Sequence, residues 1–199
     1  MVFDIGGVLE ITQEMTFTWN WESKLGLSPG EIGRRLADVW AGGSVGSVSE
    51  DHVHRSIGDR LDLSGAEVEL MMSQMWSEYL GIGNDELIEY LRGLRPRYRT
   101  GILSNSFVGA REREQEAYDF PALVDDLVYS HEVGMNKPDP RIYQLTCTRL
   151  GVAPEETIFL DDLEVNVTGA REAGLHAVLY RNNSQAVAEL EATISAQVT

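Results

Sequence analysis

The chain begins with one short apolar run and settles into a strand–helix alternation in its second half. Apolar runs of strand length lie at residues 1–4, 99–106, 125–130, 157–162 and 176–180. Between the later runs apolar residues recur at helical spacing, as Ile142, Leu145 and Leu150 do before Gly151, which predicts helices there. Strands that alternate with helices predict an α/β fold with a parallel sheet and right-handed crossovers.

Residues 14–96 follow a different rhythm. Helical patterns predict helices at 16–26, 29–41, 49–61, 65–80 and 84–94. Ser49 and Ser64 mark two of the starts, because a serine oxygen can accept a free N–H of the first helical turn. The glycine-rich stretch 41–49 is predicted to be a loose connector. We therefore expect a core of residues 1–13 and 97–199 and a helical cap of residues 14–96, whose last helix, about 84–94, belongs to either part.

The composition limits the kind of protein. With 199 residues, of which 43% are hydrophobic, the chain has the size of one domain that carries an insertion. Its 16 basic and 32 acidic residues give a formal net charge of −16, which argues against nucleic acid or an anionic membrane as a partner, since both attract basic clusters. The single cysteine and the lack of a long apolar run predict a cytoplasmic protein without disulfides or membrane spans. The sequence leaves the oligomeric state open.

Residues able to do chemistry follow the predicted strands. They are Asp4, Ser104 with Asn105, Lys137 in a later loop, and Asp161 with Asp162. Each alone is an ordinary capping, turn or surface residue. In an open parallel sheet, however, ligands bind at the carboxyl ends of the strands. Carboxylates gathered there can hold Mg²⁺, a lysine and a hydroxyl can bind an anion, and a carboxylate can act as a nucleophile.

Four segments resemble the motifs of the haloacid dehalogenase-like hydrolase superfamily, in the order in which that family has them. They are "VFDIGGVL", "ILSNS", "KPDPRIY" and "IFLDDLEVNVTGAREAG". The segment "WAGGSVGSVSEDHV" is similar to part of the family's helical cap. The resemblance covers nearly the whole chain and implies a Rossmann-like, three-layer core with a parallel sheet and a small all-helical cap.

The resemblance implies roles in phosphoryl transfer. Asp4 would be the nucleophile that forms an aspartyl-phosphate, and Ser104 would bind the transferring group. Asn105, through its amide, and Gly7 would contact the substrate. Lys137 would hold both the transferring group and the negative charge of the nucleophile.

The same resemblance implies a Mg²⁺ site. Asp162 would be a direct ligand together with Asp4 and the backbone carbonyl of Gly6, and Asp161 would act nearby, directly or through water. Asn166 would support this loop from the next helix turn. The implied activity is hydrolysis of a phosphoric monoester, with a small phosphometabolite such as a sugar phosphate as substrate.

The first motif departs from most phosphatases of the family at Gly6, where they carry a second aspartate. Glycine keeps the carbonyl but lacks the carboxyl that protonates the leaving group, an effect worth about 10²–10⁴ in rate. Three alternatives follow: a phosphatase for esters with good leaving groups, such as anomeric sugar phosphates, a 2-haloacid dehalogenase, or a domain that binds a phosphorylated ligand or a partner without turnover. The pair Asp161–Asp162 favours the first, because the dehalogenase branch needs no metal and lacks these paired acids.

A few further residues are secondary candidates. Glu10 is the first candidate to replace the missing acid, although we expect it to face solvent at the mouth of the loop. Candidate contacts of the cap with the substrate are Trp19, Trp21, Arg34, Trp40 and His54. We expect packed or exposed positions without a catalytic role for His131, His176 and Cys147.

Overall fold

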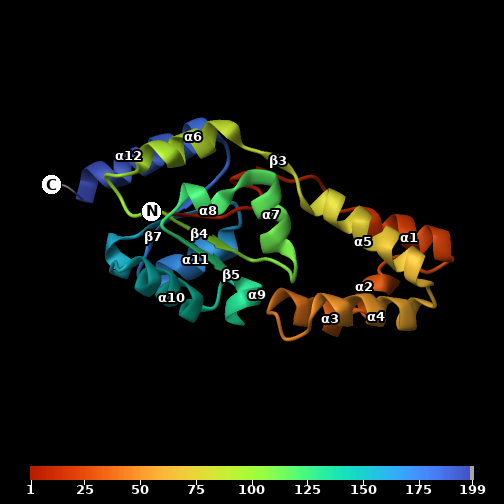
Figure 1. Cartoon of the computed structure of the whole chain (residues 1–199). Coiled ribbons are helices and arrows are strands. Elements are labelled where there is room, and N and C mark those ends of the chain that lie inside the picture. The colour runs from red at the N-terminus through yellow and green to blue at the C-terminus, as the bar shows by residue number, and fades with distance from the viewer. Residues whose placement is uncertain (198–199) are drawn as a thin grey trace.

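A five-stranded parallel sheet forms the centre of the computed structural model, which describes residues 1–197 (Figure 1). In order across the sheet, the strands are β5 (Asp126–Tyr129), β4 (Gly101–Ser104), β1 (Val2–Phe3), β6 (Ile158–Asp161) and β7 (His176–Leu179). The short strand β1 lies in the middle, where Val2 is the register partner of both Gly101 and Phe159. The predicted α/β fold with a parallel sheet is confirmed.

Helices cover both faces of the sheet, which gives three layers. On one face α6 (Asp85–Leu94) and α12 (Asn183–Gln197) lie side by side (Figure 1), and Leu91 and Leu190 share an apolar cluster with Phe3. On the other face α10 (Pro140–Leu150) and α11 (Glu164–Glu172) enclose a second cluster that contains Val2 and Phe159. The remaining helices of this part are α7 (Ala110–Tyr118), α8 (Phe120–Leu123) and α9 (Ser130–Val133).

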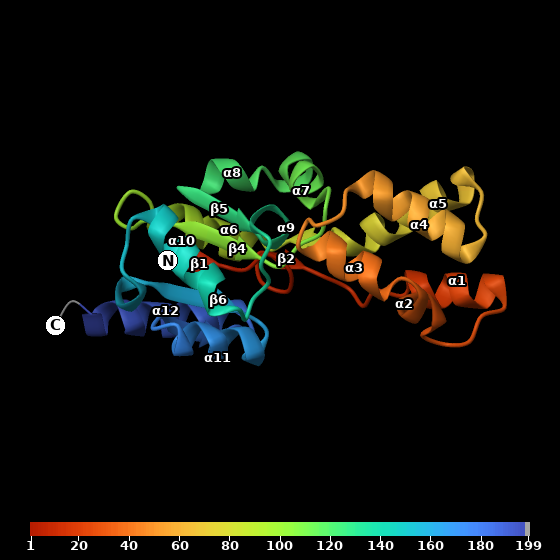
Figure 2. The same ribbon diagram turned by 90° about the horizontal axis from the view of Figure 1, so that it is seen from below.

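A helical cap extends away from the sheet (Figure 2). Its helices are α1 (Phe17–Leu25), α2 (Glu31–Arg35), α3 (Ala37–Ser44), α4 (Glu50–Leu61) and α5 (Gly65–Tyr79). They surround an apolar cluster of their own, which includes Trp21, Ile32 and Met71. Two short antiparallel strands, β2 (Glu10–Ile11) and β3 (Ile82–Gly83), pair where the chain enters and leaves the cap.

The prediction of one helix over 29–41 is wrong, because the chain breaks at Leu36 between α2 and α3. The guanidinium of Arg60 donates to the backbone oxygen of Arg35 at 2.8 Å and also binds the carboxylate of Asp38. That oxygen would serve an N–H four residues later in a continuous helix. The side chain of Arg60, distant in sequence, therefore stabilises the end of α2.

The prediction of a loose connector over 41–49 is also partly wrong, because α3 continues to Ser44. Helix α3 includes Gly42 and Gly43 despite the poor helix propensity of glycine. A Cβ on Gly43 would lie 2.1 Å from the ring of Phe107, so glycine lets the helix approach the core closely. The close packing of the two parts outweighs the local preference.

Helix α6 packs with the sheet, because Leu87, Leu91 and Leu94 lie in the same buried cluster as Phe3. We therefore propose that α6 belongs to the core and that the cap lies between β2 and β3. Sequence patterns predicted neither this strand pair nor α8, α9 and α12. Within residues 1–197, none of the helices has both the length and the apolar character needed to cross a bilayer.

Candidate active site

The residues expected to act together meet at the carboxyl edge of the sheet. Asp4 follows β1, Ser104 ends β4 and Asp161 ends β6. Lys137 lies between α9 and α10, in the loop that returns toward the same edge. Because neighbouring parallel strands end on the same side, three separate segments of the sequence converge on one point.

Lys137 connects two of the carboxylates. Its ammonium lies 2.7 Å from Asp4 Oδ1 and 2.6 Å from Asp161 Oδ2, and it also donates to the backbone oxygen of Leu103 at 3.1 Å. The side chain is fully buried. The side chain of Asn105 holds the backbone of this lysine with two hydrogen bonds, of 2.7 and 3.0 Å. The side chain of Asn105 thus positions the backbone of Lys137.

Asp161 is held from several sides. Its Oδ1 accepts the Leu163 N–H at 2.8 Å, and the Asn166 side chain lies 3.1 and 3.2 Å from its two oxygens. The Tyr143 hydroxyl in turn donates to the backbone oxygen of Asn166 at 2.8 Å. Asn166 therefore lies in the first turn of α11 with its side-chain amide on the carboxylate of Asp161. These bonds and Lys137 occupy both oxygens of Asp161.

Three acids crowd around this single lysine. Asp4, Asp161 and Asp162 each offer one oxygen, and these oxygens all lie within 4.8 Å of one another. Burial raises the pKa of Asp4, with Lys137 opposing and Asp161 adding to the rise. Burial also raises the pKa of Asp162, again reinforced by Asp161. The surplus negative charge and the all-oxygen donor set fit a hard divalent cation such as Mg²⁺.

The two glycines after Asp4 differ in their freedom. Gly7 has a φ of +73°, and a Cβ there would lie 2.3 Å from Asp162 Oδ2. Gly6 has no left-handed backbone, and the nearest atom to its Cβ position is the Thr12 methyl at 3.9 Å. The turn therefore requires glycine at position 7 for its contact with Asp162, whereas position 6 has room for a side chain.

The expectation that Glu10 faces solvent is wrong. Glu10 is 1% exposed, and its carboxylate accepts the N–H of Gly81 just before β3. Burial raises its pKa to about 7. The pairing of β2 with β3 encloses this side chain, and local sequence gives no signal for a strand pair 71 residues apart.

A second buried acid, Glu114 of α7, was not among the residues predicted from the sequence. It is fully buried, and its Oε2 accepts the hydroxyl of Tyr129 at 2.5 Å. Burial raises its pKa to about 7, although the hydrogen bond from Tyr129 opposes this. Glu114 and Glu10 line a cavity of about 190 Å³ together with Gly6, Ser104 and Asn105. Glu114 lies within the charged stretch "REREQE", where no pattern marks one glutamate as inward-facing.

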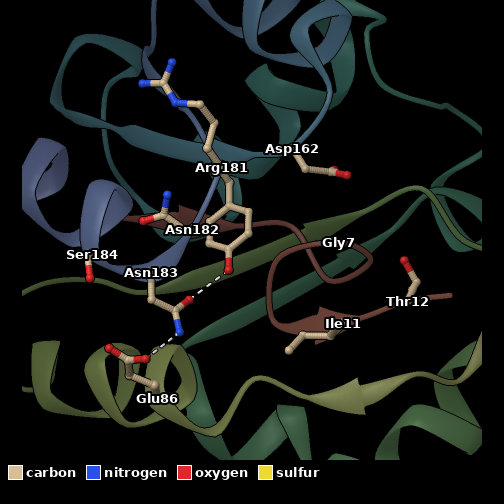
Figure 3. Close-up of a pocket in the computed structure, with 10 residues that line it drawn as sticks. Gly7, Ile11, Thr12, Glu86, Asp162, Arg181, Asn182, Asn183 and Ser184 are labelled. Atoms are coloured by element: carbon tan, nitrogen blue, oxygen red, sulfur yellow. Dashed lines mark hydrogen bonds between the residues drawn. The ribbon is translucent and has the colours of Figure 1, made fainter.

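Two other pockets are larger than this cavity. One, of about 590 Å³, extends from Gly7 and Asp162 to the start of α12. Figure 3 shows how Asn183 closes its far side, because its side chain binds both the Tyr180 hydroxyl and the carboxylate of Glu86, each at 2.8 Å. Asp162 is half-buried, so solvent reaches its carboxylate.

The second pocket, of about 540 Å³, lies between the cap and the core and is lined by Trp40 and Asn105 among others. Of the five cap residues expected near the substrate, only Trp40 lines it within the described chain. Trp21 is buried inside the cap, Trp19 is 54% exposed, Arg34 is exposed, and His54 lines a separate hollow of the cap.

Comparison with known proteins identifies relatives over most of the chain. The family described as haloacid dehalogenase-like hydrolase matches residues 1–174. D-ribitol-5-phosphate phosphatase of Bacteroides thetaiotaomicron is 29% identical over 92% of this chain and 92% of its own length. Sesquiterpene phosphatase astK of Aspergillus oryzae is 28% identical over 87% of this chain and 85% of its own length.

The fold also has close structural neighbours. A crystal structure of a haloacid dehalogenase family enzyme from Bacteroides thetaiotaomicron, in complex with magnesium and inorganic phosphate, superposes with a TM-score of 0.75. That match covers 90% of this chain and 92% of the other at 23% identity. Some curated relatives are far longer, and this chain spans only 19% of the length of the first ones that it matches.

Proposed function

The chain belongs to the haloacid dehalogenase-like hydrolases, and we propose that it is a Mg²⁺-dependent phosphatase that cleaves phosphoric monoesters of small molecules through Asp4. One observation carries this proposal: the Lys137 ammonium binds both Asp4 and Asp161 at the strand ends, and Asp162 completes the cluster of acids. The two relatives with phosphatase names support the reaction class.

The residues of the chain can divide the reaction into two steps. Lys137 and the Ile5 N–H, at 2.7 and 2.8 Å, hold Oδ1 of Asp4, and we assign Oδ2 to attack on phosphorus. A bond forms from Oδ2 to phosphorus while the bond from phosphorus to the ester oxygen breaks, which leaves an aspartyl-phosphate. The ester oxygen departs as an alkoxide and takes its proton from water. Water then attacks this phosphorus, releases inorganic phosphate and restores the Asp4 carboxylate. Ser104 and the Asn105 amide would bind the phosphoryl oxygens.

The metal would sit among Asp4, Asp162 and the carbonyl of Gly6. When bound, Mg²⁺ would neutralise charge that builds up on the transferring phosphoryl group. Asp161 would support the metal site indirectly, because hydrogen bonds from Lys137, Asn166 and Leu163 already occupy its oxygens. Three carboxylates beside one lysine also support a metallophosphatase over a dehalogenase, which needs no metal.

Two features concern the alternatives. Against a domain without turnover, Asp4, Ser104, Lys137 and Asp161 are all buried, and Asp162 lies with Asp4 and Asp161 in one cluster of acids. Against efficient cleavage of poor leaving groups, Gly6 supplies no proton donor. We also propose a cytoplasmic location, a small phosphorylated ligand and no nucleic-acid or membrane partner, in line with the net charge of −16 and the buried, free Cys147.

The test is hydrolysis of p-nitrophenyl phosphate by the wild type and by Asp4→Asn. We expect the substitution to abolish turnover, because an amide cannot form the aspartyl-phosphate, and we expect EDTA to suppress wild-type activity until Mg²⁺ is added. Asp59→Asn, at an exposed position of α4, is the matched control and keeps full activity. Wild-type turnover in Asp4→Asn contradicts the mechanism, and halide release from a 2-haloacid without metal would instead identify a dehalogenase.

A further inference from the structure

The pocket between cap and core contains an unusual set of side chains for so acidic a protein. Its wall comes from the start of α1, from α2, α3 and α5 of the cap, and from the loops after β4 and before α10 of the core. The described lining residues, none of which is charged, are Met15, Phe17, Thr18, Gly33, Trp40, Ser44, Met75, Tyr79, Asn105, Ser106, Phe107 and Asn136.

Aromatic residues and methionines are half of the residues that line the described wall. The ring of Trp40 lies 6.4 Å from that of Phe17 and 5.7 Å from that of Phe107, measured between centroids. Met75 and Tyr79 add an apolar edge from α5. Such rings offer large contact area to an apolar ligand, because they remain ordered by packing against one another.

Most of the polar side chains in the wall already have partners. Ser44 donates to the Ala41 carbonyl and accepts from Asn136, at 2.9 and 3.0 Å. Ser106 is bonded to the ring of His131 at 2.6 Å.

The side-chain amide of Asn105, also on the core side, binds the backbone of Lys137. The side-chain oxygen of Asn136 is buried and has no hydrogen-bond partner, so it is a free acceptor in this wall. A ligand rich in hydroxyl groups would lose its hydration in this pocket and find few free side chains to bind, which is costly.

The pocket shares wall residues with the small cavity beside the proposed phosphoryl site. Asn105 lines both this pocket and the small cavity that contains Ser104 and Gly6. An ester whose phosphoryl group lies at Ser104 would therefore direct its organic group past Asn105 toward Trp40 and Phe107.

We propose that the organic group of the substrate is apolar, an alkyl, isoprenoid or aryl chain that fills the space between cap and core, and that the protein discriminates against phosphorylated polyols and sugars. This proposal rests on the proposed phosphatase function. The substrate class follows from the uncharged, largely apolar wall of the pocket and from its volume of about 540 Å³.

The test compares monoesters whose leaving groups are all primary alcohols, so that only the organic group varies. The series runs from ethyl through butyl and hexyl to octyl phosphate, below their micelle concentrations, with ribitol 5-phosphate and glycerol 3-phosphate as polar members. We expect kcat/KM to rise by up to about fourfold per buried methylene and to level off once the pocket is full. Equal or higher kcat/KM for the polyol phosphates than for octyl phosphate overturns the proposal.

A glycine in the wall provides a direct probe. No atom lies within 4 Å of the Cβ position of Gly33, so Gly33→Leu adds a side chain at the pocket wall without a clash at its first atom. We expect the ratio of octyl to ethyl kcat/KM to fall at least tenfold. Gly93→Leu, at an exposed helix position of α6 that is equally free of neighbours, keeps the wild-type ratio. An unchanged ratio in Gly33→Leu contradicts the assignment.

Binding separates this proposal from the proposed function. Calorimetric titration with the same alkyl phosphates, on the Asp4→Asn protein with Mg²⁺ present, reports affinity without turnover. If no ester is hydrolysed by the wild type, the phosphatase proposal fails, and affinity that rises with chain length in this titration still supports the apolar pocket. Affinity that is flat with chain length, or higher for ribitol 5-phosphate, overturns the pocket assignment whatever the turnover.

Discussion

Position 6 offers a way to add the missing proton donor. Gly6 lacks a left-handed backbone, and the nearest atom to its Cβ position lies 3.9 Å away, so Gly6→Asp should fold. The residue lines the same small cavity as Ser104 and Asn105, which is where the ester oxygen would leave. A carboxyl at this point is within reach of the leaving group.

The cost of the added acid depends on the metal. Asp4, Asp161 and Asp162 already place oxygens within 4.8 Å of one another beside one lysine. A fourth carboxylate at that separation would add roughly 3 kcal/mol of repulsion per neighbour at an effective dielectric constant of about 20. We therefore expect Gly6→Asp to melt far below the wild type in EDTA and to recover with Mg²⁺, because the cation offsets the repulsion.

The kinetic gain should depend on the leaving group. General acid catalysis contributes about 10²–10⁴ in rate, and it matters most where the leaving alkoxide is a strong base. In a series of monoesters that spans leaving-group pKa, the wild type should show a steep decline from aryl to alkyl phosphates. Gly6→Asp should raise kcat/KM for alkyl esters at least tenfold more than for aryl esters and so flatten this dependence.

The control is Gly6→Asn, which has nearly the same shape but no proton to give. Equal acceleration of alkyl-ester cleavage by Gly6→Asp and Gly6→Asn would refute the reasoning. The gain in kcat/KM would then come from a polar side chain at this position and not from proton transfer. A flat dependence in the wild type would also refute it and would mean that an ordered water or the buried Glu10 already supplies the proton.

Two further predictions concern stability and the turn. Burial raises the pKa of Glu114 to about 7 from the usual 4.5, so the folded state binds this proton more tightly than the unfolded state. The stability that the bound proton contributes is complete below pH 4.5 and is lost as the pH rises through 7. Glu114→Gln should therefore reduce the fall in the free energy of unfolding between pH 5 and pH 8 by about 2–3 kcal/mol, measured by urea denaturation, and an unchanged fall would show that other groups cause it. Gly7→Ala should lower stability and Mg²⁺ affinity well beyond the effect of Gly26→Ala. Both glycines have φ near +70°, but only at Gly7 would the added Cβ meet Asp162 Oδ2, at 2.3 Å. Equal effects of the two substitutions on metal binding would mean that backbone conformation alone matters.

The sequence could predict the acids at the strand ends because that information is local. An apolar run followed by Asp4 or Asp161 marks the end of a buried strand, and the topology of a parallel sheet then brings such ends together. The helical spacing of Ile142, Leu145 and Leu150 before Gly151 likewise predicted α10, which begins at Pro140. These features need no knowledge of distant contacts.

The features that the sequence missed all depend on long-range contacts. Helix α2 ends at Arg35, where Arg60 binds its backbone oxygen. Helix α3 runs through Gly42 and Gly43, where Val48 and Phe107 fill the space that side chains would need. Glu10 is buried because β2 pairs with a strand 71 residues later. The local sequence around a glutamate does not indicate whether its side chain is buried. The burial of Glu10 and Glu114 could therefore not be predicted from sequence patterns.

The pairing of β2 with β3 means that the cap is an insertion with both of its ends at the same place. Glu10 lies opposite Gly83 and Ile11 opposite Ile82, and antiparallel partners of this kind can be joined by a two-residue hairpin turn. An Asn-Gly turn from Ile11 to Ile82 would thus delete the five cap helices and leave every strand of the parallel sheet in its register. Phe107, whose ring packs on the cap, would then need a polar replacement. The fold can therefore be viewed as a small core that carries an exchangeable cap. Different cap domains could be inserted between β2 and β3 while the acids at the strand ends stay unchanged.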